Sequence, residues 1–160
     1  MFEIERTRNA KSLVDFCELN GLPNIRSWTN TNDIQKALNN EDLFAYNAET
    51  PSEKKTQSII GVIIGGFEEE GRIWLEMLAV SNKFRRKGIG KALINRVCEI
   101  GTSKNYRGCF VDVDISNSGA ITFYKKCGFK QVGEIKNYYF DDTDALIFMK
   151  RIKEFTDKNP

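Results

Sequence analysis

A short stretch of this chain combines glycines and basic side chains in a spacing that suits an anion. Residues 85–91 read Arg-Arg-Lys-Gly-Ile-Gly-Lys and follow an apolar run. The first N–H groups of a helix have no partner within the helix, and the helix dipole adds partial positive charge there. Gly88 and Gly90 lack a Cβ, so oxygen atoms can approach the backbone. The stretch predicts a pyrophosphate site, although an ordinary polar loop is the alternative for these residues alone.

Other kinds of site chemistry find little support in the composition. The chain has no histidine, and its four cysteines are far apart, with no C-x-x-C pair. Zinc binding and a thiol nucleophile activated by histidine are therefore not expected, and we expect no metal. We expect reduced thiols that pack in the core, namely Cys17, Cys98, Cys109 and Cys127.

The length and charge of the chain suit one compact domain. The 160 residues carry 24 basic and 22 acidic side chains, a net charge of +2, so the basic excess of a nucleic-acid-binding protein is missing. The first residues are charged and no apolar run approaches about 18 residues, so we expect no signal peptide, no membrane partner and a cytoplasmic location. We expect a monomer or homodimer, with residues 1–152 as the domain and 153–160 as a loose tail.

Apolar periodicity predicts the elements that position the glycine-containing stretch. Strands are predicted at residues 2–6, 42–47, 58–67, 73–80, 108–115, 129–135 and 144–152. Helices are predicted at residues 11–19 and 31–38, from Gly88 to Ile100, and from Asn117 or Ser118 to Lys126. The strand, helix and strand around Gly88 form a crossover, which normally makes the two strands parallel.

Two separated motifs give residues 58–151 a resemblance to the GCN5-related N-acetyltransferase superfamily. The first, [Q/R]-x-x-G-x-[G/A], is present as Arg85, Gly88 and Gly90. The second, N-x-x-A-x-x-x-Y-x-x-x-G-F, is present as Asn117, Ala120, Tyr124, Gly128 and Phe129. Two motifs in the expected order and element context are more specific than either alone.

The resemblance implies an α/β (α+β) single-domain fold. It has a mixed, mostly antiparallel sheet of six to seven strands, a splayed parallel pair formed by the fourth and fifth strands, and about four helices on both faces. Residues 1–57 would form the acceptor side and residues 58–151 the acetyl-CoA-binding core.

The resemblance also implies acetyl-CoA as the cofactor. The backbone of Leu78 and Val80 would contact the pantetheine arm, and Asn117 would hydrogen-bond the cofactor. The pyrophosphate would lie on Arg85, Arg86, Lys87, Gly88, Ile89, Gly90 and Lys91.

Three residues are candidates for proton transfer. Tyr124 is implied as the acid that protonates the departing thiolate, and a tyrosine hydroxyl, with a pKa of about 10, keeps its proton at neutral pH. Plain core packing is the alternative for Tyr124. Without histidine, the base must be a carboxylate acting directly or through water. We rank Glu76 first, because it is the only charge in a strand otherwise fit for burial, and Asp112 second. Structural or solvated carboxylates are the alternatives.

The acceptor is an amine whose identity the sequence leaves open. The resemblance places acceptor contacts at Trp28, Tyr138 and Tyr139, and ring faces suit a cationic amine. The aspartates at 141, 142 and 144 are interpreted as hairpin-turn residues. The tail is weakly similar to that of ribosomal-protein N-terminal alanine acetyltransferases, so a small-molecule amine and a peptide N-terminus both remain. A non-catalytic acyl-CoA sensor is another alternative, whereas Leu93 stands where a nicotinamide-binding motif needs Gly or Ala.

Overall fold

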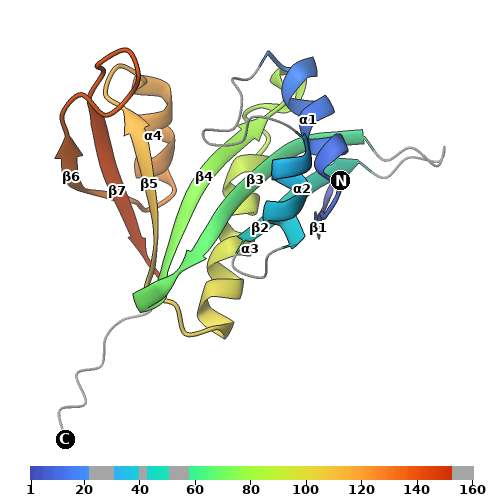
Figure 1. Ribbon diagram of the computed structural model, residues 1–160, viewed down its shortest axis with the longest axis horizontal. Helices are drawn as coiled ribbons and strands as arrows, with labels where there is room; N and C mark the ends of the chain where they lie inside the picture. The colour runs from blue at the N-terminus through green and yellow to red at the C-terminus, as the bar shows by residue number, and fades with distance from the viewer. Residues whose placement is uncertain (22–30, 40–42, 51–57, 153–160) are drawn as a thin grey trace, which may run out of the picture. The chain divides into compact units, whose positions relative to one another are not determined.

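A computed structural model describes residues 1–21, 31–39, 43–50 and 58–152 of the chain (Figure 1). The strands are β1 (Glu3–Arg6), β2 (Leu43–Thr50), β3 (Ser58–Glu68), β4 (Arg72–Val80), β5 (Gly108–Asp114), β6 (Lys130–Ile135) and β7 (Ala145–Arg151). The helices are α1 (Ala10–Leu19), α2 (Thr31–Asn39), α3 (Ile89–Ser103) and α4 (Ser118–Lys126). None of these helices is long and apolar enough to cross a membrane, within the ranges given.

The seven strands form one mixed sheet in the order β1-β2-β3-β4-β5-β7-β6, as the expected fold class requires. The pairs β1/β2, β2/β3, β5/β7 and β6/β7 are antiparallel, and β4/β5 is parallel. The parallel register of β4 and β5 covers only three residues of each strand, from Arg72 to Trp74 and from Gly108 to Phe110. The crossover through α3 therefore gives the parallel pair that the sequence predicts.

The chain divides into two compact units, and the division passes through β4 and α3. Unit 1 consists of Met1–Phe67 and Leu75–Val97, and unit 2 of Glu68–Trp74 and Cys98–Pro160. The paired end of β4 thus belongs to unit 2, together with β5, β6, β7 and α4. The rest of β4 belongs to unit 1, together with β1, β2, β3, α1, α2 and the start of α3.

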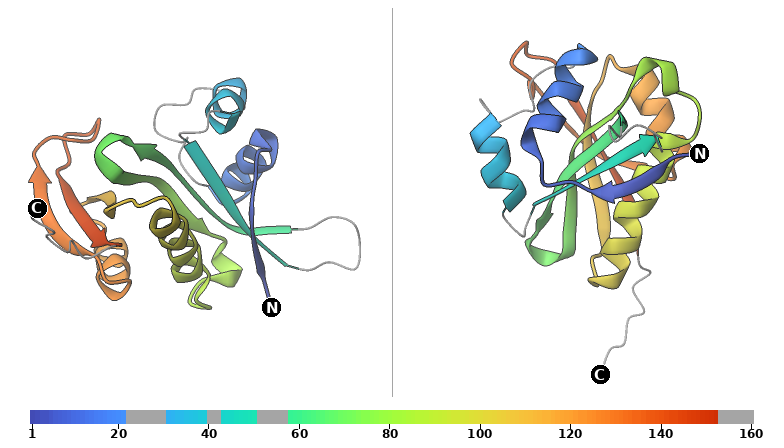
Figure 2. Two further views of the ribbon diagram at one scale, coloured as in Figure 1. Left: turned by 90° about the horizontal axis from the view of Figure 1, so that it is seen from below. Right: turned by 90° about the vertical axis from the view of Figure 1, so that its right-hand side faces the viewer.

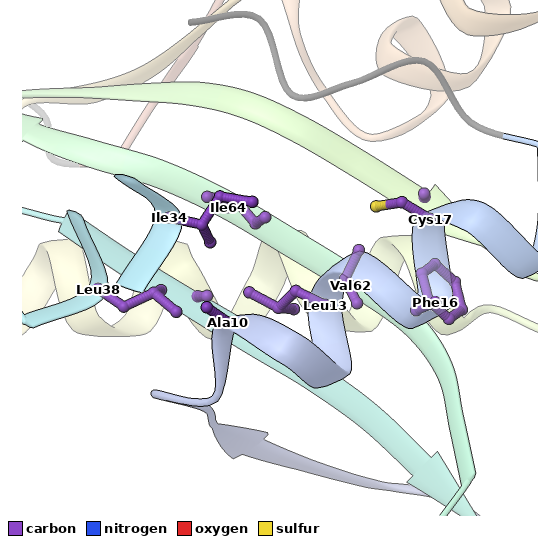
Figure 3. Packing of buried hydrophobic residues seen from close by; sticks show 10 residues of the cluster. Ala10, Leu13, Phe16, Cys17, Ile34, Leu38, Val62 and Ile64 are labelled. Carbon is purple, nitrogen blue, oxygen red and sulfur yellow. The ribbon is translucent and has the colours of Figure 1, made fainter. Parts of the chain in front are cut away.

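In unit 1, α1 and α2 cover one face of β2 and β3. The side chain of Asn9 caps α1, because its Oδ1 accepts a hydrogen bond from the N–H of Ser12 at 3.1 Å. The apolar sides of both helices pack on Val62 and Ile64 of β3 (Figure 3). The buried cluster is formed by Ala10, Leu13, Phe16, Cys17, Ile34, Leu38, Ala45, Val62, Ile64 and Ala79.

The first turns of α3 pack on the opposite face of β3 (Figure 2). A Cβ at Gly61 would lie 3.0 Å from Cγ2 of Ile89 and 3.4 Å from Cδ1 of Leu93. Neighbouring side chains of a strand point to opposite faces, so Gly61 faces away from the cluster around Val62. Glycine at position 61 therefore lets the first turns of α3 approach the strand closely.

In unit 2, β5 is the central strand and its apolar side is buried. It pairs with β7 from Gly108 opposite Arg151 to Asp114 opposite Ala145. Cys109, Val111 and Val113 are buried, as their alternation with polar residues predicts. The helix α4 ends at Lys126, and Gly128, two residues later, has the left-handed φ of 90° that is common after a helix C-terminus.

Two expectations about strand residues are wrong. Strand β2 does not end at residue 47, as predicted, but continues to Thr50, because it pairs with β1 as far as Glu49; residues 51–57 lie outside the described residues. Ile115, which the predicted strand 108–115 includes, lies beyond the end of β5 and is exposed. The strand ends before it, because Oδ1 of Asp114 accepts a hydrogen bond from the N–H of Ser116 at 2.7 Å and turns the chain toward α4.

The four cysteines are free thiols. Cys17, Cys109 and Cys127 are buried, which confirms the expected core packing, and Cys98 is half-buried. The sulfur atoms of Cys98 and Cys109 lie 3.8 Å apart. The hydrogen bond between the two thiols lowers the pKa of Cys98 to about 7, and the same bond, with burial, raises the pKa of Cys109.

Candidate active site

The loop between β4 and α3 is braced by hydrogen bonds and exposes its basic side chains. The N–H of Ser81 donates to the carbonyl of Ile60 at 2.9 Å, and Nε of Arg85 donates to the carbonyl of Val80 at 3.1 Å. Arg85, Arg86, Lys87 and Lys91 are all exposed. The guanidinium of Arg85 therefore fixes the end of β4, and the Val80 carbonyl proposed for the cofactor arm already accepts one hydrogen bond.

The start of α3 has the geometry of an anion site. Gly88 has a φ of 82°, and a Cβ at this position would meet nothing within 4 Å, so the space above the backbone is open. Its carbonyl accepts the N–H of Ala92 at 2.9 Å, which closes the first helical turn. The side chain of Ile89 is buried and anchors this turn. The N–H groups ahead of Ala92 lie in the turn where a helix binds anions, so the residues present fit a diphosphate.

Unit 2 brings together four of the residues that the sequence selects. The hydroxyl of Tyr139 donates to Oδ2 of Asp112 at 2.7 Å. The rings of Tyr138 and Tyr139 meet edge to face, with centroids 5.2 Å apart. Burial, followed by the negative charges of Asp112 and Cys127, raises the pKa of Tyr124 above its ordinary value. Asp112 therefore interacts with a tyrosine chosen for catalysis and with one chosen for the acceptor.

The tyrosine pair is held by the turn between β6 and β7. The N–H groups of Tyr138 and Tyr139 both donate to the carbonyl of Thr143, at 3.0 and 3.1 Å. Oδ1 of Asp144 accepts the N–H of Asn137 at 3.0 Å, and Oδ1 of Asp141 accepts the N–H of Thr143 at 3.2 Å. Asp141 and Asp144 thus stabilise the turn, in agreement with their interpretation as hairpin-turn residues.

The predicted burial of Glu76 is wrong. The residue is exposed in β4, in a stretch that is otherwise buried or half-buried from Ile73 to Val80. The sequence ranks Glu76 first among the candidate bases because burial would raise its pKa, and its exposure removes that reason. Leu78 and Val80 of the same strand are half-buried. Trp28 lies outside the described residues.

Asn117 has a structural role that the motif alone does not reveal. It is the N-cap of α4, and its Oδ1 accepts the N–H of Ala120 at 3.0 Å. Its own N–H donates to the carbonyl of Asp114 at 2.9 Å. Because Oδ1 is engaged in the cap, the side-chain NH₂ group is the part of Asn117 suited to donate to a ligand.

Comparison with known proteins places this geometry in a family. Residues 13–129 match the profile of the Acetyltransferase (GNAT) family. The chain belongs to this family. An N-alpha-acetyltransferase of Sulfurisphaera tokodaii is 39% identical to this chain over 71 residues, which are 44% of this chain and 42% of that protein. N-alpha-acetyltransferase 20 of Dictyostelium discoideum is 35% identical over 104 residues, 62% of this chain and 60% of that protein.

The GNAT chain spans about half the length of the curated relatives that it matches. Solved structures cover it more fully. Arabidopsis thaliana NAA60 in complex with acetyl-CoA superposes with a TM-score of 0.80 at 21% identity, over 95% of this chain and 99% of that chain. A ribosomal-protein alanine N-acetyltransferase of Escherichia coli gives 0.76 at 20% identity, over 100% and 99%. These likenesses confirm the GNAT fold.

Proposed function

We propose that the chain is an N-acetyltransferase that uses acetyl-CoA to acetylate a primary amine. The observation that carries this proposal is the start of α3, where Gly88 with a φ of 82° lies among exposed basic side chains in a segment matched by the GNAT family. The rival reading, a sensor that binds the cofactor without turning it over, lacks a specific observation in its favour.

The donor side is assigned to unit 1 and to Asn117. Acetyl-CoA supplies an acetyl group activated as a thioester. In the proposal, the backbone N–H groups between Arg85 and Lys91 and the nearby cations bind its diphosphate. The backbone of Leu78 and Val80 orients the pantetheine arm, and the NH₂ group of Asn117 donates one hydrogen bond.

Proton transfer is assigned to Tyr124 and Asp112. Burial raises the pKa of Tyr124, so its hydroxyl keeps the proton that it would donate to the departing sulfur. An acceptor ammonium must lose a proton before it can attack, and the Asp112 carboxylate, acting directly or through water, is proposed to take it. Asp112 replaces Glu76 as the first choice because Glu76 is exposed and Asp112 interacts with Tyr124.

We propose a peptide α-amine as the acceptor in preference to a small-molecule amine. The edge-to-face rings of Tyr138 and Tyr139, with Asp112 bonded to Tyr139, offer π faces and a carboxylate to an ammonium group. The names of several relatives, N-alpha-acetyltransferases, support the same choice. Trp28 stays a proposed acceptor contact.

A binding experiment tests the donor assignment. Calorimetry should detect acetyl-CoA binding to the wild type, and Gly88→Asp should weaken it about tenfold or more, because a negative charge would stand where the diphosphate binds. Gly21→Asp is the matched control: Gly21 also has a positive φ, 61°, and a Cβ there would also meet nothing within 4 Å. Equal affinity in Gly88→Asp and the control contradicts the diphosphate site.

A turnover experiment tests the acceptor assignment. Release of free thiol from acetyl-CoA is measured with peptides of varied N-terminal residue, polyamines, aminoglycosides and amino acids. We expect release with peptides and much less with the other amines. Cofactor binding without release for any of these amines would favour the sensor, and release only with small amines would overturn the peptide assignment.

A further inference from the structure

Unit 1 contains a cleft whose described lining residues are all different from the residues assigned to acetyl transfer. Its volume is about 820 Å³, within the range of small-molecule sites. The floor comes from β2 and β3, one wall from α1, and the rim from the segments that precede α1 and follow β4. It is lined by Thr7, Asn9, Ser12, Asp15, Phe16, Leu19, Asn20, Asn47, Glu49, Ile59, Ser81, Asn82 and Lys83.

Two residues that line this cleft carry buried oxygen atoms without a hydrogen-bond partner. Asn47 is only 3% exposed, and its Nδ2 donates to Oε1 of Glu49 at 3.3 Å. Oδ1 of Asn47 and Oε2 of Glu49 have no donor. Among the described residues, these are the only two buried side-chain nitrogen or oxygen atoms without a hydrogen-bond partner. An unsatisfied buried acceptor has lost its hydrogen bonds to water without replacement, so a pair of them on adjacent side chains calls for donors from outside the chain.

The strand register explains why both side chains point into the cleft. Asn47 pairs with Val62 of β3, and Val62 belongs to the cluster beneath α1 and α2. Asn47 and Glu49 are two residues apart on β2, so they share the face that α1 covers. The register shifts next to them, where Glu49 pairs with Ile59 and Ile60 is left over. This bulge turns Ile59 toward the same cleft.

The charges around the two oxygens select a cation. Asp15 and Glu49 line the cleft, and Lys83 is the one basic side chain among the lining residues that the structure describes. Asp15 already pairs with Lys11 at 3.1 Å on the same helix. Glu3 and Glu5 of β1 pair in register with Glu49 and Asn47, and directly opposed residues project to the same face.

We propose that this cleft binds a small primary amine in its ammonium form, with N–H groups donating to Oδ1 of Asn47 and Oε2 of Glu49. An ammonium offers three donors and one positive charge, which match two acceptor oxygens, one of them a carboxylate. Binding at this cleft requires neither acetyl-CoA nor the residues of unit 2.

Calorimetry without acetyl-CoA tests this site. n-Butylammonium chloride should bind the wild-type protein, whereas 1-butanol and sodium butyrate, which lack the charge or reverse it, should not. Glu49→Gln and Asn47→Leu should each weaken n-butylammonium binding about tenfold or more, because each removes one acceptor. Glu18→Gln makes the same charge change on the exposed side of α1, outside the cleft lining, and should bind as the wild type does.

Several outcomes overturn the proposal. These are the absence of n-butylammonium binding to the wild type, equal binding by the wild type and Glu49→Gln, or loss of binding in Asp112→Asn with retention in Glu49→Gln. The last result would place the amine at the proposed acceptor site. If Asn47→Leu fails to fold by circular dichroism, Glu49→Gln alone decides. Because the experiment omits acetyl-CoA, its failure is distinguishable from a failure of the proposed acetyl transfer.

Discussion

Burial suits the hydroxyl of Tyr124 to donate a proton and not to accept one. Its side chain is buried against Phe129, with ring centroids 5.2 Å apart, and its pKa is raised by burial and by the charge of Asp112. An ordinary tyrosine is half ionised at about pH 10, whereas a tyrosine with a raised pKa is still mostly protonated at that pH. The hydroxyl is thus available as an acid across the range in which amine acceptors become neutral.

Replacing Tyr124 tests this acid role. We expect Tyr124→Phe to lower turnover about a hundredfold or more, with little change in acetyl-CoA affinity, because only the donated proton is lost. Tyr46→Phe is the matched control, since Tyr46 is also buried but has no assigned role. Steady-state rates between pH 8 and pH 10.5 add a second readout: wild-type turnover should not fall near pH 10. Unchanged turnover in Tyr124→Phe would leave the tyrosine with packing alone.

The start of α4 combines a structural and a proposed binding role in one side chain. Asn117 caps the helix through Oδ1, and the proposal uses its NH₂ group for the cofactor. The two roles use different atoms, so two substitutions can separate them. Aspartate keeps a capping oxygen and loses the NH₂ group, whereas alanine loses both.

We therefore expect Asn117→Ala to lower the free energy of unfolding by about 1 kcal/mol and to weaken acetyl-CoA binding. Asn117→Asp should keep the stability and still weaken binding. Urea denaturation and calorimetry measure the two effects. Ser118→Ala, one residue later in the exposed first turn, is the control. Full cofactor affinity in Asn117→Asp would limit Asn117 to capping.

At the scale of the whole molecule, β7 contributes a fully buried side chain to the core of unit 2. Phe148 of β7 is 0% exposed and pairs in register with Val111 of β5. Phe140, in the turn before β7, is fully exposed. Phe148 and Phe140 are therefore the same residue type in the same unit and differ in burial.

Phe148→Ala should lower the free energy of unfolding by roughly 3–5 kcal/mol, because a buried ring is replaced by a cavity. Phe140→Ala should change it by less than about 0.5 kcal/mol. Thermal and urea unfolding followed by circular dichroism measure both. Similar losses for the two variants would show that the core of unit 2 does not lie at β7.

Much of the fold follows from local patterns. The apolar spacing of α3, the capping residues of α1 and α4, and the alternation of β5 each reflect interactions within a few residues, so the sequence predicts these elements and the family. The same holds for the turn proposed to bind the diphosphate, because Gly88 and its basic neighbours are contiguous. Strand ends were less predictable: β2 reaches Thr50 because of its pairing with β1, which is far away in the chain.

The sequence by itself determined the GNAT family, the order of the elements and the segment suited to an anion, since contiguous residues encode all three. Only the tertiary structure decided that Glu76 is exposed, that Asp112 bonds Tyr139, and that Asn47 and Glu49 are left with unpaired oxygens in a cleft. Burial and hydrogen bonding between distant residues depend on which strands pair and which helix covers them, and no local pattern records that.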